Sequence, residues 1–177
     1  MIVKPPVEPV HTTDRLRRAG LVAEAQMGHY LHRAFATHKE LFVLNDLRIE
    51  DPEQPEHNGS PGVCQIDHLV LHRWGAFIVE SKSVTTVVHV QPDGAGGDEW
   101  TRTYDGQRRG MASPIKQAQL QGDLLRNFLN SHAAELLGKM PLGMRTIMKI
   151  AKGTDQRGFR NMPIQVLAAI SDNGRIE

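Results

Sequence analysis

Two neighbouring apolar runs, Cys64–Leu71 and Ala76–Lys82, constrain what this chain can fold into more than any other feature. Both are rich in aliphatic residues, and the four residues between them, HRWG, end in a glycine suited to a tight turn. This pattern predicts two central strands joined as a hairpin. The runs nevertheless contain Asp67, Glu80 and Lys82. Ionised side chains are rarely buried without a partner, so these three must be paired or must bind something.

The register of the hairpin decides how these charges meet. If Leu71 pairs with Ala76, an assumption supported by the glycine in the turn, Asp67 lies opposite Glu80 on the same face of the sheet. Directly opposed side chains have Cβ atoms about 4.5–5.5 Å apart. Two carboxylates that close together either share a proton or need a cation between them.

A hard divalent cation, Mg²⁺ or Mn²⁺, suits such a pair because these ions prefer carboxylate and carbonyl oxygens. The main-chain carbonyl of Ser81 is a further candidate ligand, and Lys82 brings an ammonium group toward any anion that the ion holds. The pattern therefore predicts a site for phosphodiester hydrolysis built on Asp67, Glu80 and Lys82. The alternative is a Glu80–Lys82 salt bridge on a solvated sheet face, with Asp67 uninvolved.

The rest of the chain predicts an α/β fold around a mixed sheet. One helix begins at Arg15 after Asp14 as N-cap, and a second begins after Ser113 and ends at Gly138. Residues 1–14, with three prolines, are expected to be an extended N-terminal arm, and 15–177 a single domain. Residues 102–112 are expected to be irregular. Further strands are expected at 40–47, 83–90, 100–104, 144–151 and 163–170.

Composition narrows the choice of partners. The formal net charge of the 177 residues is +1, so a nucleic acid would have to be attracted by a local basic surface. The single cysteine, Cys64, excludes an internal disulfide and a thiolate zinc cluster. No apolar run reaches membrane-spanning length and the start lacks a secretory signal, so we expect a cytoplasmic protein with no membrane partner.

The segment QIDHLVLHRWGAFIVESKS, residues 65–83, resembles the central motif of the nuclease-related domain (NERD) family, a branch of the PD-(D/E)xK restriction-endonuclease-like superfamily. The family pattern is a Gln-Ile-Asp-His run, a small turn and an apolar strand that ends in Glu-x-Lys. Gly20 with Glu24, and Trp100 with the helix start SPIKQ ending at Gln117, are similar to features that flank this motif. The resemblance spans about residues 18–129. The chain departs from the pattern in an acidic insertion at 49–62, and at Ser81, where the family usually has an apolar residue.

This resemblance implies a restriction-endonuclease-like mixed β-sheet flanked by helices, with an αβββαβ core. It also implies that Asp67 and Glu80 bind the metal and that Lys82 orients or stabilises the attacking water. The expected function is a metal-dependent nuclease acting on DNA, with RNA left open. The alternative is a noncatalytic module of the same fold that binds nucleic acid or protein. A homodimer and an additional domain or protein partner are also left open.

Several residues outside the hairpin are secondary candidates. Glu24 is either a third carboxylate at the ion or a solvated helix residue, because the sequence does not set the rotation of the helix. Gln117, in the first turn of the second helix, is expected to hold a phosphate or the attacking water unless it is simply a surface residue. His68 is expected to be packed on the opposite face from Asp67. The candidates for phosphate contacts, which are otherwise solvated surface residues, are Arg102, Arg108, Arg109 and Lys116.

Overall fold

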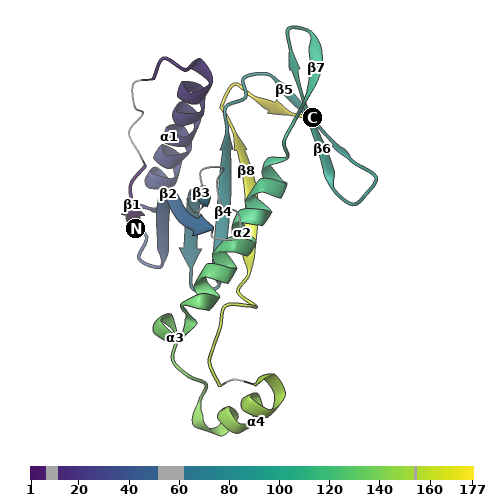
Figure 1. Ribbon diagram of the computed structural model, residues 1–177. Coiled ribbons are helices and arrows are strands. Elements are labelled where there is room, and N and C mark those ends of the chain that lie inside the picture. The colour runs from purple at the N-terminus through teal and green to yellow at the C-terminus, as the bar shows by residue number, and fades with distance from the viewer. Residues whose placement is uncertain (7–11, 52–61, 154) are drawn as a thin grey trace.

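The structure is a computed structural model that describes residues 1–6, 12–51, 62–153 and 155–177. Its centre is a five-stranded mixed sheet with the strand order β1-β2-β3-β4-β8 (Figure 1). The β1–β2 and β4–β8 pairs are parallel, and the two pairs between them are antiparallel. The strands are Ile2–Lys4 (β1), Leu41–Asp51 (β2), Gly62–His72 (β3), Gly75–Lys82 (β4) and Ile164–Ile170 (β8).

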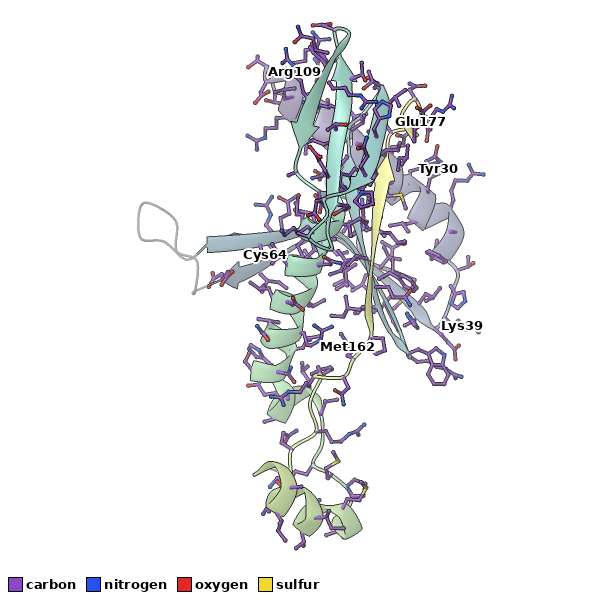
Figure 2. All side chains as sticks on the ribbon, turned by 90° about the vertical axis from the view of Figure 1, so that its right-hand side faces the viewer. Tyr30, Lys39, Cys64, Arg109, Met162 and Glu177 are labelled. Atoms are coloured by element: carbon purple, nitrogen blue, oxygen red, sulfur yellow. The ribbon has the colours of Figure 1, made fainter. Side chains whose placement is uncertain are left out.

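Two long helices cover opposite faces of this sheet (Figure 2). They are α1 (Arg15–Phe35) and α2 (Pro114–Ser131). Each face has its own buried apolar cluster, because each helix directs one apolar stripe at the strands. The fully buried members are Leu31, Val43 and Val70 on the α1 side, and Ile49, Ile66, Leu69, Ala76, Ile78, Ala118 and Leu125 on the α2 side. The order α1, β2, β3, β4, α2, β8 is the predicted αβββαβ core.

Both helices begin at the predicted residues. The Asp14 side chain accepts hydrogen bonds from two main-chain N–H groups of the first turn of α1, and the Ser113 hydroxyl accepts one from Lys116 at 3.1 Å. The C-terminal part of the second helix differs from the prediction. α2 ends at Ser131, and the short helix α3 (Ala133–Leu136) follows after a break at His132.

The central hairpin of β3 and β4 has the predicted register, with Leu71 paired to Ala76. Gly75 makes the turn with a φ of 148°, and a Cβ atom at this position would lie 2.3 Å from the carbonyl oxygen of Pro163. Only glycine fits both the backbone conformation and the space. The register on which the predicted site depends is therefore fixed by this glycine and by the approach of the chain that leads into β8.

Side-chain alternation breaks once along the β2–β3 pair. Leu44 and Leu47 both pack against the cluster on the α2 side, although residues three apart on a regular strand point to opposite faces. Asp46 lies between them with a φ of 49°, in the left-handed region. On β3 the same break falls at Asp67, the residue across from Asp46. Beyond it the outer ends of the two strands, near Cys64, turn away from the rest of the sheet (Figure 2).

A second sheet, with the order β7-β6-β5-β9, projects from the end of the molecule where α2 begins (Figure 1). The expectation that residues 102–112 are irregular is wrong, because β6 and β7 form a hairpin through Asp105 and Gly106. The φ values of these two residues are 50° and 73°, as a two-residue turn between twisted strands requires. The strands are Val87–Pro92 (β5), Asp98–Tyr104 (β6), Gln107–Met111 (β7) and Arg175–Ile176 (β9).

The expected strand at 144–151 is also wrong, since this stretch forms helix α4 (Leu142–Lys152). The helix starts after Pro141 and ends at Gly153, whose φ of 72° is typical of a helix C-terminus. It lies apart from both sheets at the opposite end of the molecule from the second sheet (Figure 1). Leu142 and Ile150 are consequently 80% and 82% exposed. No helix in the described part of the chain is long and apolar enough to cross a membrane.

Part of the segment expected to be an extended N-terminal arm is extended and joins the sheet. Residues Ile2–Lys4 form the edge strand β1, parallel to β2. The α-amino group of Met1 donates hydrogen bonds of 2.7, 2.7 and 2.6 Å to the carbonyl oxygens of Phe35, His38 and Leu41. This positive group therefore lies at the C-terminal end of α1, where the helix dipole favours it.

Candidate functional site

Strands β3 and β4 separate at the candidate site. The last pair of their ladder is His68 with Val79, and Asp67 and Glu80 are the next residues on the two strands. In place of a main-chain pair, the N–H group of Ser81 donates a hydrogen bond of 2.8 Å to Oδ2 of Asp67. The two carboxyl groups thus lie at the point where the hairpin opens, with a side chain of one strand bound to the main chain of the other.

Glu80 is the most enclosed charged residue of the site, at 2% exposure. Its Oε1 accepts a hydrogen bond of 2.6 Å from the ammonium group of Lys82, and its Oε2 accepts one of 2.9 Å from the amide of Gln121. The same ammonium group donates to the side-chain oxygen of Gln117 at 3.0 Å. The Glu80–Lys82 pair of the alternative interpretation therefore exists, but Glu80 is buried rather than on a solvated face.

Asp67 is a buried carboxyl group with a strongly raised pKa. Burial, and next the charge of Glu80, raise the pKa of Asp67 from 3.8 to about 7. The hydrogen bond from Ser81 and the charge of Lys82 lower this pKa, but their effect is smaller than that of burial and the charge of Glu80 together. A buried carboxyl group with such a pKa either holds a proton at neutral pH or needs a cation nearby.

Glu24 reaches the same region from α1. Burial raises the pKa of Glu24, followed by the charges of Asp46 and Glu80, while the pKa of Asp67 in turn responds to Glu24. The predicted third carboxylate is therefore within electrostatic range of the other two. Within the described ranges, however, no three Cys, His, Asp or Glu side chains come close enough together to hold a metal ion by themselves.

A buried polar chain supports the strand that carries Ser81. The Asn45 amide donates to the carbonyl oxygen of Lys4 at 2.8 Å, so its Oδ1 faces Nδ1 of His68 at 2.7 Å and Nδ1 must carry the proton. Nε2 of His68 then accepts from the Ser81 hydroxyl at 3.0 Å. Burial lowers the pKa of His68 to about 4, so the ring is neutral at physiological pH. His68 is 1% exposed, so the expectation that it is packed is confirmed.

Sequence reasoning missed Gln121 and Asn45. Gln121 lies one turn after Gln117 on α2, and residues four apart on a helix share a face, so its position was a usable signal. Asn45 gives no such signal, because its role depends on pairing with His68 across two strands.

The predicted basic residues do not lie among the carboxylates. Arg102 pairs with Arg109 across β6 and β7, and Arg108 pairs with Thr103 on the same hairpin. The Arg109 guanidinium lies 5.5 Å from the ring centroid of Tyr104, a cation–π contact at the tip. Figure 2 places Arg109 at the far end of the projecting sheet. Lys116 is in the first turn of α2 and is exposed.

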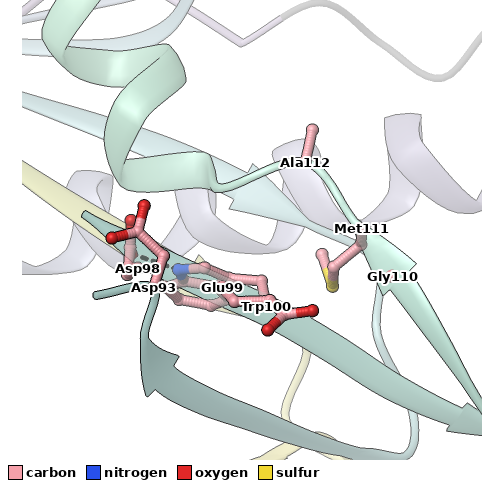
Figure 3. Close-up of a pocket in the computed structure, with 7 residues that line it drawn as sticks. All are labelled: Asp93, Asp98, Glu99, Trp100, Gly110, Met111 and Ala112. Carbon is pink, nitrogen blue, oxygen red and sulfur yellow. Dashed lines mark hydrogen bonds between the residues drawn. The ribbon is translucent and has the colours of Figure 1, made fainter. Parts of the chain in front are cut away.

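A cavity of about 500 Å³ lies beside the second sheet and does not include the carboxylates of the hairpin (Figure 3). Two acidic residues in its lining already have structural partners. Asp98 accepts hydrogen bonds from the Ser113 hydroxyl at 2.9 and 3.1 Å and from the indole N–H of Trp100. Asp93 accepts two main-chain N–H bonds of 2.8 Å within its own loop. The Asp98 carboxylate thus links the second sheet to the start of α2, and the Asp93 carboxylate stabilises the loop between β5 and β6.

A mixed sheet between two helices, with two carboxylates and a lysine where its central hairpin opens, defines the restriction-endonuclease-like class of α/β proteins. The family model described as "Nuclease-related domain" (NERD) matches residues 19–146, which is most of the chain. The chain therefore belongs to the nuclease-related domain family, within the PD-(D/E)xK superfamily. The matched range contains every residue of the site. Searches of curated proteins and of solved structures give no match to this chain.

Proposed function

We propose that this domain is a metal-dependent nuclease that hydrolyses phosphodiester bonds in DNA. The observation that carries the proposal is the pair of buried carboxyl groups, Asp67 and Glu80, at the open end of the hairpin. Burial, and next the charge of Glu80, raise the pKa of Asp67 to about 7, and a cation between the two carboxylates would offset both effects. A salt bridge with Lys82 alone leaves these effects in place, because it neutralises only one of two carboxylates.

The donor set fits Mg²⁺ or Mn²⁺. Oδ2 of Asp67 is taken by the Ser81 N–H group, while Oδ1 has no hydrogen-bond partner among the described residues. The N–H and C=O groups of one extended residue project from the same strand edge, so the Ser81 carbonyl faces the gap that its N–H group spans. Two carboxylates and one carbonyl make a partial oxygen set, and Mg²⁺ sites commonly keep the remaining positions for water and substrate phosphate.

The other residues would act around the ion as follows. When bound, the ion would polarise a phosphate oxygen and make a water molecule more acidic. Lys82, whose side chain is 25% exposed, would orient the attacking water and hold negative charge of the phosphate. Gln117 would keep this ammonium group in place through its 3.0 Å contact. Glu24, facing the carboxylates from α1, would add negative charge that favours cation binding.

The DNA backbone would be held by the basic residues of the β6–β7 hairpin and the start of α2. A two-stranded ribbon is narrow enough to follow a DNA groove, and arginines on it can contact phosphates. The four proposed contact residues are Arg102, Arg108, Arg109 and Lys116.

A noncatalytic binding module is the second candidate. It is favoured by the fact that both oxygens of Glu80 already have protein partners and that no three-ligand group exists among the described residues. In such a module Lys82 would substitute for the ion, and the basic hairpin would still bind nucleic acid.

One experiment separates these candidates. The purified protein, Glu80→Gln and Lys82→Ala are incubated with linear and structured DNA, and separately with RNA, in the presence of Mn²⁺. A nuclease gives cleavage that EDTA abolishes and that Glu80→Gln lowers at least about a hundredfold, as expected when a group that stabilises transition-state charge is lost. Equal outcomes for the three proteins, with nucleic acid still bound, would establish the module instead.

A further inference from the structure

Gln121 is a polar residue at a position where the helix favours an apolar one. It is 4% exposed and lies in the buried stripe of α2. Burying an amide is unfavourable unless its hydrogen bonds are made, so its presence among apolar neighbours requires a specific reason. The other members of this stripe are Pro114, Ala118, Gly122 and Leu125.

The two hydrogen bonds of the Gln121 amide fix its orientation. Nε2 donates 2.8 Å to the carbonyl oxygen of Gln65 on β3 and 2.9 Å to Oε2 of Glu80 on β4. Both partners only accept, so the amide cannot be turned around. Its Oε1 is buried and is one of the side-chain atoms in the described structure without a hydrogen-bond partner.

Gln121 joins the two strands at the place where their own ladder has ended. The last main-chain pair is His68 with Val79, and the amide of Gln121 spans the opening beyond it from Gln65 to Glu80. It therefore sets both the direction of the Glu80 carboxylate and the separation of the strands. Being neutral, it does so without competing with a cation, unlike Lys82 on the other oxygen of Glu80.

We propose that Gln121 is a positioning residue that holds Glu80 in the orientation needed for cation binding. This inference rests on the proposed metal-dependent function. Residues that hold a metal ligand in place typically change metal affinity or activity by about 10–100-fold when they are replaced. Gln121→Met fills a similar volume without either hydrogen bond, and Gln121→Asn keeps an amide that is too short to reach both partners.

The test is the affinity of the metal-free protein for Mn²⁺, measured by calorimetry. Gln121→Met and Gln121→Asn should each weaken binding by about tenfold or more. Gln119→Met is the matched control, because Gln119 is exposed on the same helix and should leave the affinity unchanged. Leu125→Ala is the stability control: Leu125 is 3% exposed, so the variant should melt earlier but bind Mn²⁺ normally below its melting temperature.

A second measurement separates positioning from general damage. The Mn²⁺ concentration that gives half-maximal DNA cleavage should rise about tenfold or more in Gln121→Met, while cleavage at saturating Mn²⁺ stays within about threefold of the parent. Wild-type affinity in both Gln121 variants, or an equal loss in Leu125→Ala, would overturn the inference and leave the proposed nuclease intact. Absence of Mn²⁺ binding by the parent protein would overturn both.

Discussion

The main-chain N–H group of Ser81 donates to the side-chain carboxylate of Asp67 at 2.8 Å. Strand β4 is thus bound to a side chain of β3 directly after it stops pairing with the main chain of β3. This exchange of partners opens the hairpin without leaving the Ser81 donor unpaired. It also brings a second buried acid next to Glu80, and most of the expected behaviour of the site follows from that.

Asp67 should make the metal-free protein less stable as the pH rises. Its pKa is raised from 3.8 to about 7, so the folded protein keeps a proton that the unfolded chain loses above about pH 4. The stabilisation is present at low pH and is lost between about pH 4 and 7, at up to about 1.4 kcal/mol per pH unit. Asp67→Asn should therefore be more stable than the parent protein at pH 8, with the difference shrinking toward pH 4.

Urea unfolding at several pH values in EDTA measures this difference. On the proposed function, excess Mn²⁺ should reverse it at pH 8, because only the parent keeps both carboxylates for the ion. A difference between the two proteins that did not vary with pH would contradict the raised pKa.

The contribution of His68 to stability should change with pH in the opposite direction to that of Asp67. Burial lowers the pKa of His68 from 6.5 to about 4, so its contribution to stability is present above about pH 6.5 and is lost as the pH falls toward 4. His68→Leu should lower the free energy of unfolding by about 1–3 kcal/mol at pH 7.5, since Asn45 and Ser81 lose a buried partner. The deficit should narrow at pH 4.5.

His29→Leu is the matched control for this variant, because His29 is exposed on α1 and should change stability by less than about 0.5 kcal/mol. Equal effects of the two histidine variants on urea unfolding would argue against the buried network.

Lys82 and Glu80 should be coupled in stability. Lys82→Met removes the 2.6 Å partner of a carboxylate that is only 2% exposed, and should cost about 1.5–3 kcal/mol in EDTA. Adding Glu80→Gln to Lys82→Met should restore part of this loss, because the buried charge is then gone. A double-mutant cycle by urea unfolding measures the coupling, and strictly additive effects would mean that the two groups do not interact in solution.

Binding of DNA should depend on the tip of the β6–β7 hairpin. Arg108→Ala and Arg109→Ala should each weaken binding and reduce the slope of log affinity against log salt by about one, as for the loss of one phosphate contact. Arg33→Ala serves as the control. Arg33 is an exposed arginine in the last turn of α1 and is not part of the β6–β7 hairpin. Fluorescence anisotropy with a labelled duplex at several salt concentrations gives the slopes, which should be unchanged for Arg33→Ala.

The sequence is sufficient to predict the parts of the fold that depend on local rules. The helix starts at Asp14 and Ser113 follow from side chains that cap N–H groups. The hairpin register follows from Gly75 and from the apolar runs on both sides. Because the register is local, the sequence alone also predicts that Asp67 and Glu80 lie at the same level of neighbouring strands.

Other parts could not be predicted in this way. The apolar residues of 144–151 occur at spacings compatible with both strand and helix, so spacing alone does not separate the two, and the structure has a helix there. Asp46 adopts the left-handed conformation that breaks the alternation of β2. The sequence does not mark this position, because aspartate does not favour that conformation as glycine does.

The hairpin at Asp105 and Gly106, by contrast, was predictable, since this dipeptide is a strong turn signal.

Strand β8 has a consequence for how the protein is made. After β3 and β4 part, the segment Glu80–Lys82 pairs with residues 168–170 of β8, which leave the ribosome long after the hairpin itself. A parallel neighbour of such sequence separation forms late in folding. We therefore expect a nascent chain that has not yet reached Ile170 to hold Glu80 in an unsupported edge strand, and the proposed cation site to be complete only after β8 has been made.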